Sequence, residues 1–364
     1  MHRVAFNGRF SGTPQPTGTQ TVAFQLFDAI LREPRSFEAV VFADSRFPGI
    51  SEWRTLPGVK WIEVPFQDWP RAWAQFWEQF FLPRLARQHG CRLAHHPITT
   101  CPVWQNGVKN VVTLHDLNFH RHPEWYSRSF RLVYALGAVP GLKRAARVVT
   151  ISNYVRGQAA ESFNLRPERL RMVYNGVKPL AAPGPAGGGN YLLCVGSLQP
   201  HKNLVRLIRA YLKIQPEFPG LELRVVGRPQ ARFAAESELP ALLSAPGVQL
   251  LGYLSEAGLA QAYAGARVFC YPSLEEGFGL PVLEAMTLGA PVLTSNVSCL
   301  PEVAGPATLV DPYSVEAIAG GLRQLLALAP PALAALAAEG RAWAARFSWA
   351  AAARGYLKLY GELF

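Results

Sequence analysis

The sequence has few of the residues that build disulfide scaffolds or metal sites. It contains five cysteines among 364 residues, an odd number at wide spacing, and no C-x2-C pair. This usage predicts reduced thiols and a cytoplasmic location, and it argues against a disulfide framework. The densest group of metal-binding residue types is His89, Cys91, His95 and His96, and no matching second half follows it. A D-x-D pair is also absent, so we expect no metal ion and no cofactor.

Long apolar runs and dense blocks of positive charge are missing as well. No uninterrupted apolar run approaches the roughly 20 residues that span a bilayer, and the N-terminal residues enter a strand pattern without a signal-peptide core. We therefore expect a soluble or peripheral protein. The formal net charge of +11 favours acidic partners. Because no Lys/Arg run with interleaved aromatics accompanies this charge, we expect no nucleic acid partner.

What is present is a globular composition of two-domain length. Apolar residues make up 49% of the chain and charged residues 17%, a balance typical of a globular fold. A chain of 364 residues exceeds one ordinary core and suits two domains. Residues 179–189 are rich in Pro and Gly and lack periodicity. They predict a linker between a first domain at 1–178 and a second domain at 190–346.

Short apolar runs that end in glycine or turn residues predict buried parallel strands. The predicted strands are 3–7, 38–43, 59–64, 110–114, 147–151, 173–177, 191–196, 223–227, 248–252, 267–271 and 291–294. Helical periodicity follows several of them, as in 20–32 and 204–212. This alternation fits an α/β chain.

The most informative stretch links a predicted strand to a short helix. Gly277 and Gly279 form a loop in which a ligand can approach the main chain closely. Pro281 suits the first turn of the helix, so the loop amides lie at a helix N-terminus, a natural phosphate site. Glu276 and Glu284 could both reach one ligand there, and hydroxyls of a ribose and a sugar suit them better than a diphosphate, which they would repel. Two glutamates that merely complement the helix dipole are the alternative.

This stretch resembles a known signature. It reads Pro-Ser-Leu-Glu-Glu-Gly-Phe-Gly-Leu-Pro-Val-Leu-Glu-Ala-Met, with seven residues between Glu276 and Glu284, and is similar to the signature of the retaining glycosyltransferases of family 4, also called group 1. The resemblance implies a GT-B fold, with two Rossmann-like parallel-sheet domains that face a central cleft. It implies a nucleotide-sugar in the second domain, an acceptor in the first, and a last helix at 347–364 that crosses back to the first domain.

The resemblance also implies roles for residues of the second domain. Lys202 stands in Pro-His-Lys-Asn, a context similar to the family's Pro-Arg-Lys-Asn, and would neutralise the diphosphate and stabilise its developing charge. Glu284 would accept ribose hydroxyls and Glu276 hydroxyls of the donor sugar. The implied binding residues of this domain are Ser197, Lys202, Asn203, Gly227, Leu251, Tyr253, Glu276, Gly277, Phe278, Gly279, Leu280 and Glu284.

Ser197 is a departure from the family pattern. Many members carry an arginine at this position, so one cation on the phosphates is absent here or is supplied from elsewhere. Arg9 and His201 are the candidates.

In the first domain, His115 and Asp116 follow a predicted strand, at the edge where open α/β sheets bind ligands. A side-chain pair that ties down a loop is the alternative. Gly12 and Gly18 lie in a loop before a predicted helix, which suits a phosphate or is an ordinary flexible loop. The resemblance implies that His115 points toward the transferred sugar as a catalytic residue with Lys202, that Asp116 holds its loop or contacts ligand, and that the glycines face the donor phosphates. Glu276 completes the implied catalytic set.

Residues 69–87 gather aromatic and arginine side chains. Positions 73, 76, 77, 80 and 81 share one helix face, although Pro83 must kink or end that helix. Such a helix could insert into an anionic membrane surface near a lipid-linked acceptor, or it could pack in the core of the first domain. Trp77-Glu78-Gln79 matches a Trp-Glu-Gln segment that similar family members often carry.

The sequence thus predicts a metal-independent retaining glycosyltransferase, cytoplasmic or peripheral on the inner face of the membrane. It would move a sugar from a nucleotide-diphosphate sugar to a saccharide or lipid-linked acceptor in polysaccharide or glycan biosynthesis. Gly-Ser-Leu-Gln-Pro-His-Lys-Asn is similar to mannosyltransferases and favours GDP-mannose, while UDP-glucose, UDP-N-acetylglucosamine and dTDP-rhamnose stay open. The alternatives are a UDP-sugar 2-epimerase, or a catalytically silent nucleotide-sugar or RNA-binding protein.

Overall fold

The computed structural model describes residues 1–14, 16, 18–126, 131–132, 134–180, 188–228 and 237–364. The chain forms two compact units. The first unit contains residues 1–121, 128–176 and 348–364, and the second contains residues 122–127 and 177–347. Most of the predicted linker at 179–189 lies outside the described residues, because 181–187 are not among them.

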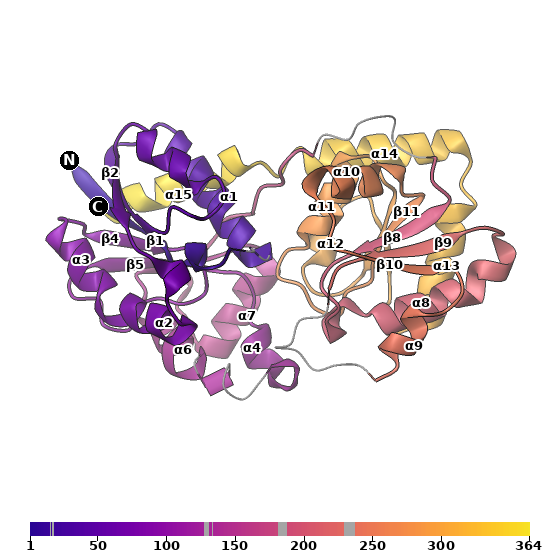
Figure 1. The fold of residues 1–364 in the computed structure, drawn as a ribbon, viewed down its shortest axis with the longest axis horizontal. Helices are drawn as coiled ribbons and strands as arrows, with labels where there is room; N and C mark the ends of the chain where they lie inside the picture. Colours follow the sequence, from indigo (N-terminus) through magenta and orange to yellow (C-terminus); the bar gives the residue numbers. More distant parts are fainter. Residues whose placement is uncertain (15, 17, 127–130, 133, 181–187, 229–236) are drawn as a thin grey trace. The chain divides into compact units, whose positions relative to one another are not determined.

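The first unit is built on a parallel sheet (Figure 1). Its described strands are β1 (His2–Gly8), β2 (Phe37–Ala43), β3 (Val59–Glu63), β4 (Leu93–His96), β5 (Lys109–Leu114), β6 (Arg147–Thr150) and β7 (Leu170–Met172). Their order in the sheet is β3-β2-β1-β4-β5-β6-β7, so the direction of winding reverses between β1 and β4. Ligands of open parallel sheets bind beyond the carboxyl ends of the strands at such a reversal.

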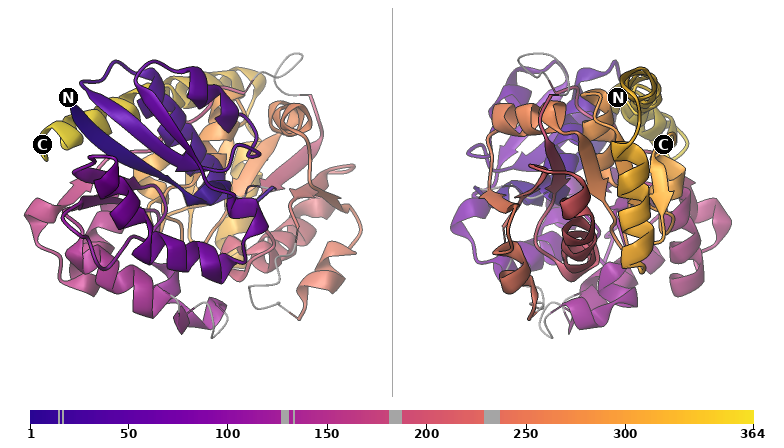
Figure 2. Two further views of the ribbon diagram at one scale, coloured as in Figure 1. Left: turned by 60° about the vertical axis from the view of Figure 1, so that its left-hand side comes forward. Right: turned by 90° about the vertical axis from the view of Figure 1, so that its right-hand side faces the viewer.

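Helices cover both faces of this sheet. On one face α1 (Gly18–Arg32) and α15 (Trp349–Gly361) pack together over Phe6, and on the other α2 (Arg71–Phe80) packs over Phe42 with its buried Trp77 (Figure 1 and Figure 2). Successive strand residues point to opposite faces, which is why Ala5 and Phe6 belong to different cores. Further helices of this unit are α3 (Leu82–Gln88), α4 (Asn118–Arg121), α6 (Val139–Arg144) and α7 (Asn153–Phe163).

Buried polar contacts also hold α15 on the first sheet. The Tyr360 hydroxyl lies 2.5 Å from Nδ1 of His95, and the Tyr356 hydroxyl lies 2.7 Å from Oγ1 of Thr113. His95 Nε2 and the same Thr113 oxygen are 2.9 Å apart, so the four side chains are hydrogen-bonded in the order Tyr360, His95, Thr113, Tyr356. Burial lowers the pKa of His95 well below its usual value, so the ring stays neutral and can both donate and accept in this chain.

The second unit contains a parallel sheet of the same kind. Its described strands are β8 (Tyr191–Val195), β9 (Glu222–Val226), β10 (Val248–Gly252), β11 (Val268–Tyr271), β12 (Val292–Ser295) and β13 (Thr308–Val310). Their order is β10-β9-β8-β11-β12-β13, with the reversal between β8 and β11.

Helices cover the second sheet on both faces as well. The pair α8 (Leu204–Ile214) and α13 (Val315–Leu326) packs on one face, and α10 (Glu256–Gly265), α11 (Leu280–Thr287) and α14 (Pro330–Ala344) lie over the other (Figure 1). The unit also contains the short helices α9 (Leu239–Leu243) and α12 (Leu300–Val303). In the described part of the chain, no single helix is both long and apolar enough to cross a membrane, and Val315–Leu326 with Pro330–Gly361 meets that test only as a pair bent by 110°.

One predicted strand was wrong. Residues 173–177 are not a strand, because β7 pairs with β6 and already ends at Met172. The apolar run beyond it packs beneath α15 instead. Val173 contacts the α15 core, and a Cβ added to Gly176 would lie 2.2 Å from the backbone nitrogen of Trp349. Apolar residues that pack under a helix and apolar residues in a buried strand give the same local pattern.

Candidate functional site

Two loops meet at the carboxyl edge of the second sheet, where β8 and β11 are neighbours. The loop after β8 leads through the turn Pro200–Lys202 into α8, and the loop after β11 leads into α11. Asn203 joins them, since its buried side-chain amide donates to the carbonyl oxygens of Pro272 at 2.9 Å and Pro312 at 2.7 Å. Its backbone is left-handed, with a φ of 61°. Asn203 was predicted to contact a nucleotide-sugar, and in this structure its amide fastens the loops.

Lys202 and Glu276 form an ion pair where these loops meet. Lys202 Nζ lies 2.6 Å from Oε1 of Glu276 and donates to the Tyr271 hydroxyl, also at 2.6 Å. The hydroxyls of Tyr271 and Ser273 donate to the same Oε1, at 2.8 and 2.6 Å. Both side chains of the pair remain slightly open to solvent, at 14% for Lys202 and 12% for Glu276. The cluster is therefore preorganised around one carboxylate oxygen while a ligand can still reach it.

The charge state of Glu276 follows from these neighbours. Burial raises the pKa of this carboxyl. The nearby charges of Lys202 and His201 and the hydrogen bonds from Lys202 and Ser273 together lower it by more than burial raises it, so the net pKa lies below its usual value. Glu276 is thus a carboxylate at neutral pH, and Lys202 faces a full negative charge.

Glu284 has the opposite electrostatic setting. It lies on α11, and the Tyr263 hydroxyl donates to its Oε2 at 2.9 Å. Burial raises the pKa of Glu284, the hydrogen bond from Tyr263 lowers it, and the charge of Glu256 raises it again, so the net pKa lies above its usual value. The two glutamates of the signature therefore differ in how strongly they hold a proton.

Glycines shape the backbone around the cluster. Gly279 caps α11 with a φ of 89°, and an added Cβ would lie 2.8 Å from Leu300, so both the conformation and the space require glycine. Gly277, the buried Phe278 and Leu280 complete the turn into α11. Such a turn directs backbone N–H groups beyond the helix N-terminus.

The ends of β8, β9 and β10 carry the other predicted residues of this unit. A Cβ on Gly227 would lie 1.8 Å from the carbonyl oxygen of Gly196, so glycine is required where these strand ends approach. Ser197 directly follows Gly196, and its carbonyl oxygen accepts from the backbone N–H of Gln199 at 2.8 Å. Leu251 lies on β10 and Tyr253 just beyond it, and both are exposed. Both can therefore meet a ligand from solution.

In the first unit, His115 follows β5 and is nearly buried. Its Nε2 lies 2.7 Å from the carbonyl oxygen of Pro97, which follows β4, and so carries the proton. Burial lowers the pKa of His115 more than the bond to Pro97 raises it, which favours a neutral ring. Asp116 accepts from the backbone of Asn118 at 3.0 Å and so holds the start of α4.

The glycines predicted in the first unit differ in their surroundings. Gly12 ends the turn Arg9–Gly12, and an added Cβ would lie 3.0 Å from Phe66. Gly18 opens α1, and a Cβ there would meet nothing within 4 Å. Close packing therefore disfavours a side chain at Gly12 and leaves room for one at Gly18.

The two candidates for the cation missing at Ser197 have other partners. Arg9 pairs with the buried Glu78 at 3.0 Å and donates to Thr100 at 2.7 Å. The His201 ring stacks on Trp125, with ring centroids 5.4 Å apart. Arg9 in this structure therefore neutralises a carboxylate of its own unit.

The structure thus brings Lys202 and Glu276 into contact and places Glu284 in the following helix. Sequence reasoning missed Tyr271, Ser273 and Tyr263, the hydroxyl donors that position the two glutamates. Ser273 lies within the quoted signature and Tyr271 directly precedes it, so their closeness to Glu276 in the sequence is a signal that could have found them. Among the described residues, no group of three or more His, Cys, Asp or Glu side chains could hold a metal ion.

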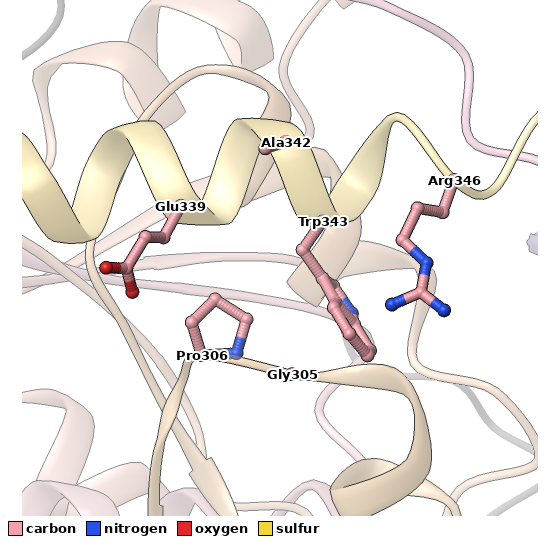
Figure 3. Close-up of a pocket in the computed structure, with 6 residues that line it drawn as sticks. All are labelled: Gly305, Pro306, Glu339, Ala342, Trp343 and Arg346. Carbon is pink, nitrogen blue, oxygen red and sulfur yellow. The ribbon is translucent and has the colours of Figure 1, made fainter.

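A separate pocket of about 560 Å³ opens beside α14 (Figure 3). Its lining residues are Gly305, Pro306, Glu339, Ala342, Trp343 and Arg346. The Trp343 indole donates to the Val303 carbonyl at 2.7 Å, packs against Gly305, and lies under the Arg346 guanidinium, 4.2 Å from the ring centroid. The indole is fixed by these contacts, and we assign no ligand to this pocket.

Solved structures with the same fold define the class. A sucrose-phosphate synthase from Thermosynechococcus elongatus has a TM-score of 0.77 at 21% identity, covering 100% of this chain and 99% of the other. HepE from Anabaena, in complex with UDP-glucose, has a TM-score of 0.74 at 18% identity and 100% coverage of both chains. The GT-B fold predicted from the sequence is therefore confirmed, and with it two parallel sheets of the Rossmann type.

Family models then identify the family within that class. A model described as "Glycosyl transferases group 1" matches residues 181–343, and one described as "Glycosyltransferase Family 4" matches residues 16–179. The chain belongs to the group 1 glycosyltransferases, family 4, as its signature predicted.

Sequence relatives include two mannosyltransferases. The O-antigen chain mannosyltransferase B of Escherichia coli is 31% identical over 264 residues, which are 66% of this chain and 66% of that protein. The MMP alpha-(1->4)-mannosyltransferase of Mycolicibacterium hassiacum is 31% identical over 280 residues, which are 73% of this chain and 63% of that protein. The alignments thus span slightly less than two thirds of these relatives' lengths.

Proposed function

We propose that this chain transfers a sugar, with retention of its anomeric configuration and without a metal ion, from a nucleotide-diphosphate sugar to a saccharide or lipid-linked acceptor. GDP-mannose is the donor that we favour. The observation that carries the proposal is the Lys202–Glu276 pair at the reversal of the second sheet, beside the N-terminus of α11. Family membership and the two mannosyltransferase relatives support it.

The leaving group is the diphosphate. As the bond between the anomeric carbon and the phosphate oxygen breaks, its electron pair goes to that oxygen. Lys202, the amides of Phe278, Gly279 and Leu280, and the dipole of α11 would stabilise the charge. Lys202 is bound to Glu276 in this structure, and the more highly charged diphosphate would compete for it. These fixed charges are the support for a metal-independent reaction.

Glu276 and Glu284 would hold hydroxyl groups. Among the described residues, all hydrogen bonds to Glu276 end on Oε1, which leaves Oε2 to accept from the donor sugar. Glu284 would accept from the ribose while Tyr263 fixes its other oxygen. Exposed Leu251 and Tyr253 would border the base. The acceptor hydroxyl would attack from the face that the phosphate leaves and give its proton to a phosphate oxygen.

The first unit would bind the acceptor at the carboxyl edge of its own sheet. His115 and Asp116 follow β5 there, and we assign His115 to orienting the reacting sugar through its neutral ring. His115→Ala should lower transfer and leave the affinity for free GDP unchanged. The protein would act in the cytoplasm or at the inner face of a membrane.

Thermal unfolding with GDP, UDP, dTDP and ADP in the presence of EDTA tests the donor site. A ligand at about 100 times its Kd stabilises a protein by about 2.7 kcal/mol, and we expect that shift for GDP with the wild type and its loss in Lys202→Ala. Transfer from GDP-mannose, followed by NMR of the product anomer, tests the reaction. An inverted product, or activity that EDTA abolishes, would contradict the proposed mechanism. Turnover of a UDP-sugar without acceptor would indicate the 2-epimerase, and binding without turnover would indicate a silent protein.

A further inference from the structure

The helix α2 uses only one of its two aromatic sides in the core. Trp77 is buried against Phe66 and Phe42, with ring centroids 5.0 and 6.1 Å away. The other side exposes an aromatic patch, which consists of Trp73, Phe76, Phe80 and Phe81, each between 40% and 45% exposed. Each of these side chains therefore keeps a large apolar surface in solvent, whereas Trp77 fills the core.

The patch is continuous, and it is held rigidly. Ring centroids of Trp73 and Phe76 are 5.2 Å apart, and those of Phe76 and Phe80 are 4.6 Å apart. On the inner side of α2, Glu78 is fully buried and bonded to Asn7 and Thr100 at 2.7 and 2.9 Å. The helix is thus anchored through its inner side, and its outer rings are presented on a fixed backbone.

Only positive charge accompanies the patch along α2 and α3. Residues 71–88 contain three arginines, Arg71, Arg84 and Arg87, all of them exposed. The single acid of this segment is Glu78, which is buried and paired with Arg9. Arg84 and Arg87 are three residues apart on α3, which follows α2 after a break at Phe81, so exposed arginines directly follow the exposed rings along the chain.

We propose that the aromatic patch and these arginines dock the first unit on a bilayer that contains anionic phospholipid. Aromatic rings on a rigid helix enter the boundary between headgroups and acyl chains, and arginines beside them bind the phosphates. The net charge of +11 attracts the chain to the same surface. A second copy of this chain is a poor occupant, because a symmetric contact would oppose identical arginines. The inference goes beyond the proposed transfer reaction and does not depend on it.

Co-sedimentation of the full chain with vesicles tests this surface. Vesicles of phosphatidylcholine alone are compared with vesicles that also contain phosphatidylglycerol. We expect binding to the anionic vesicles that is at least about tenfold stronger, and its loss in Phe76→Ser/Phe80→Ser. Arg84→Glu/Arg87→Glu should weaken anionic binding at least about 25-fold, since each cation near such a surface contributes roughly fivefold.

Two controls separate the patch from general effects. Arg156→Glu/Lys358→Glu changes the net charge by the same amount at exposed positions of the first unit outside α2 and α3, and it should bind anionic vesicles within about threefold of the wild type. Trp104→Ser removes a ring that lies outside the patch and is 73% exposed. This change should leave binding to anionic vesicles unchanged. The proposal is overturned if the wild type binds neither vesicle, or if the patch variants bind as well as the wild type. It is also overturned if Phe76→Ser/Phe80→Ser converts a dimer to a monomer and vesicles bind neither form.

Discussion

The two units each hold a cation–glutamate pair near the carboxyl ends of their strands, but the pairs are built differently. In the first unit, both oxygens of Glu78 have partners: Oε1 accepts from Asn7 at 2.7 Å, and Oε2 accepts from Thr100 at 2.9 Å and forms an ion pair with Arg9 at 3.0 Å. In the second, the described partners of Glu276 all converge on Oε1. Because Glu78 is also fully buried, we assign it to holding the first unit together.

Burial makes the same distinction, whereas the two pKa shifts have the same direction. Glu78 is fully buried, whereas Glu276 retains 12% exposure. In both carboxyls burial raises the pKa and the neighbouring cation lowers it, with a net pKa below the usual value. The two glutamates therefore have the same charge state but different surroundings. The Glu78 pair is enclosed by the protein, whereas the Glu276 pair keeps Oε2 of Glu276 and the Lys202 ammonium within reach of a ligand.

The largest expected effect comes from breaking the satisfied pair. Glu78→Ala leaves Arg9 without its partner in a mostly buried site, and removing one partner of a buried pair costs about 3–5 kcal/mol of unfolding free energy. Urea unfolding measures this. The control is Glu63→Ala, whose ion pair with Arg54 is exposed and is worth less than about 1 kcal/mol. Equal losses in the two variants would remove the distinction that we draw for Glu78.

The second effect concerns the ligand-facing pair. Lys202→Ala and Glu276→Ala should each reduce kcat/KM for donor turnover by about 30-fold or more, equivalent to about 2 kcal/mol of transition-state stabilisation. Circular dichroism should show both variants folded. Wild-type rates from either folded variant would refute its assignment to the reaction.

A smaller effect should separate the two tyrosines. Tyr271→Phe removes a hydroxyl between Lys202 and Glu276, and Tyr263→Phe removes the hydroxyl that binds Glu284. One hydrogen bond contributes about 1 kcal/mol, or about fivefold in a rate or binding constant. We expect Tyr271→Phe to lower kcat and Tyr263→Phe to raise KM for the donor. The same change in both constants for both variants would contradict these separate roles.

The smallest effect lies in the pH dependence of stability. Glu284, with a raised pKa in the folded state, favours folding fully below its unfolded pKa, and this contribution is lost as the pH rises through the folded pKa. Glu276, with a lowered pKa, contributes above its unfolded pKa, and this is lost as the pH falls through the folded value. Urea unfolding across acidic pH measures both contributions to the free energy of unfolding. Glu284→Gln should remove the contribution that is lost as the pH rises, and Glu276→Gln should remove the contribution that is lost as the pH falls. Identical pH profiles for both variants would show that the two pKa shifts do not differ in sign.

Much of the local structure could be predicted from the sequence. The strand before Pro272, the glycine loop and the helix that Pro281 begins depend on neighbouring residues, and the structure contains each of them. Ser152 is a further local signal, because a serine favours the N-cap position, and it caps α7 by accepting from the backbone of Val155 at 3.2 Å. Such signals are short-range, so sequence reasoning finds them without knowing the order of strands.

The pairings between distant residues could not be predicted. Lys202 and Glu276 are 74 residues apart, and they meet only because β8 and β11 are neighbours in the sheet. Glu78 lies in the family-like Trp77-Glu78-Gln79 segment, but nothing local reveals that Arg9 pairs with it. The helical periodicity around Trp77 is compatible with a core helix and with a membrane-surface helix, because periodicity alone does not show how far the core extends around the helix.

The hydrogen-bonded chain between β4 and α15 has a consequence for synthesis. His95 and Tyr360 are 265 residues apart, so the first sheet receives its last covering helix only after nearly the whole described chain has left the ribosome. Domains usually fold as they emerge, at about 5–20 residues per second. The surface of β1 and β4 beneath α15 would therefore stay uncovered for tens of seconds during translation. During that interval, a nascent chain of this protein exposes an apolar sheet surface to other proteins, and α15 covers that surface once it has been synthesised.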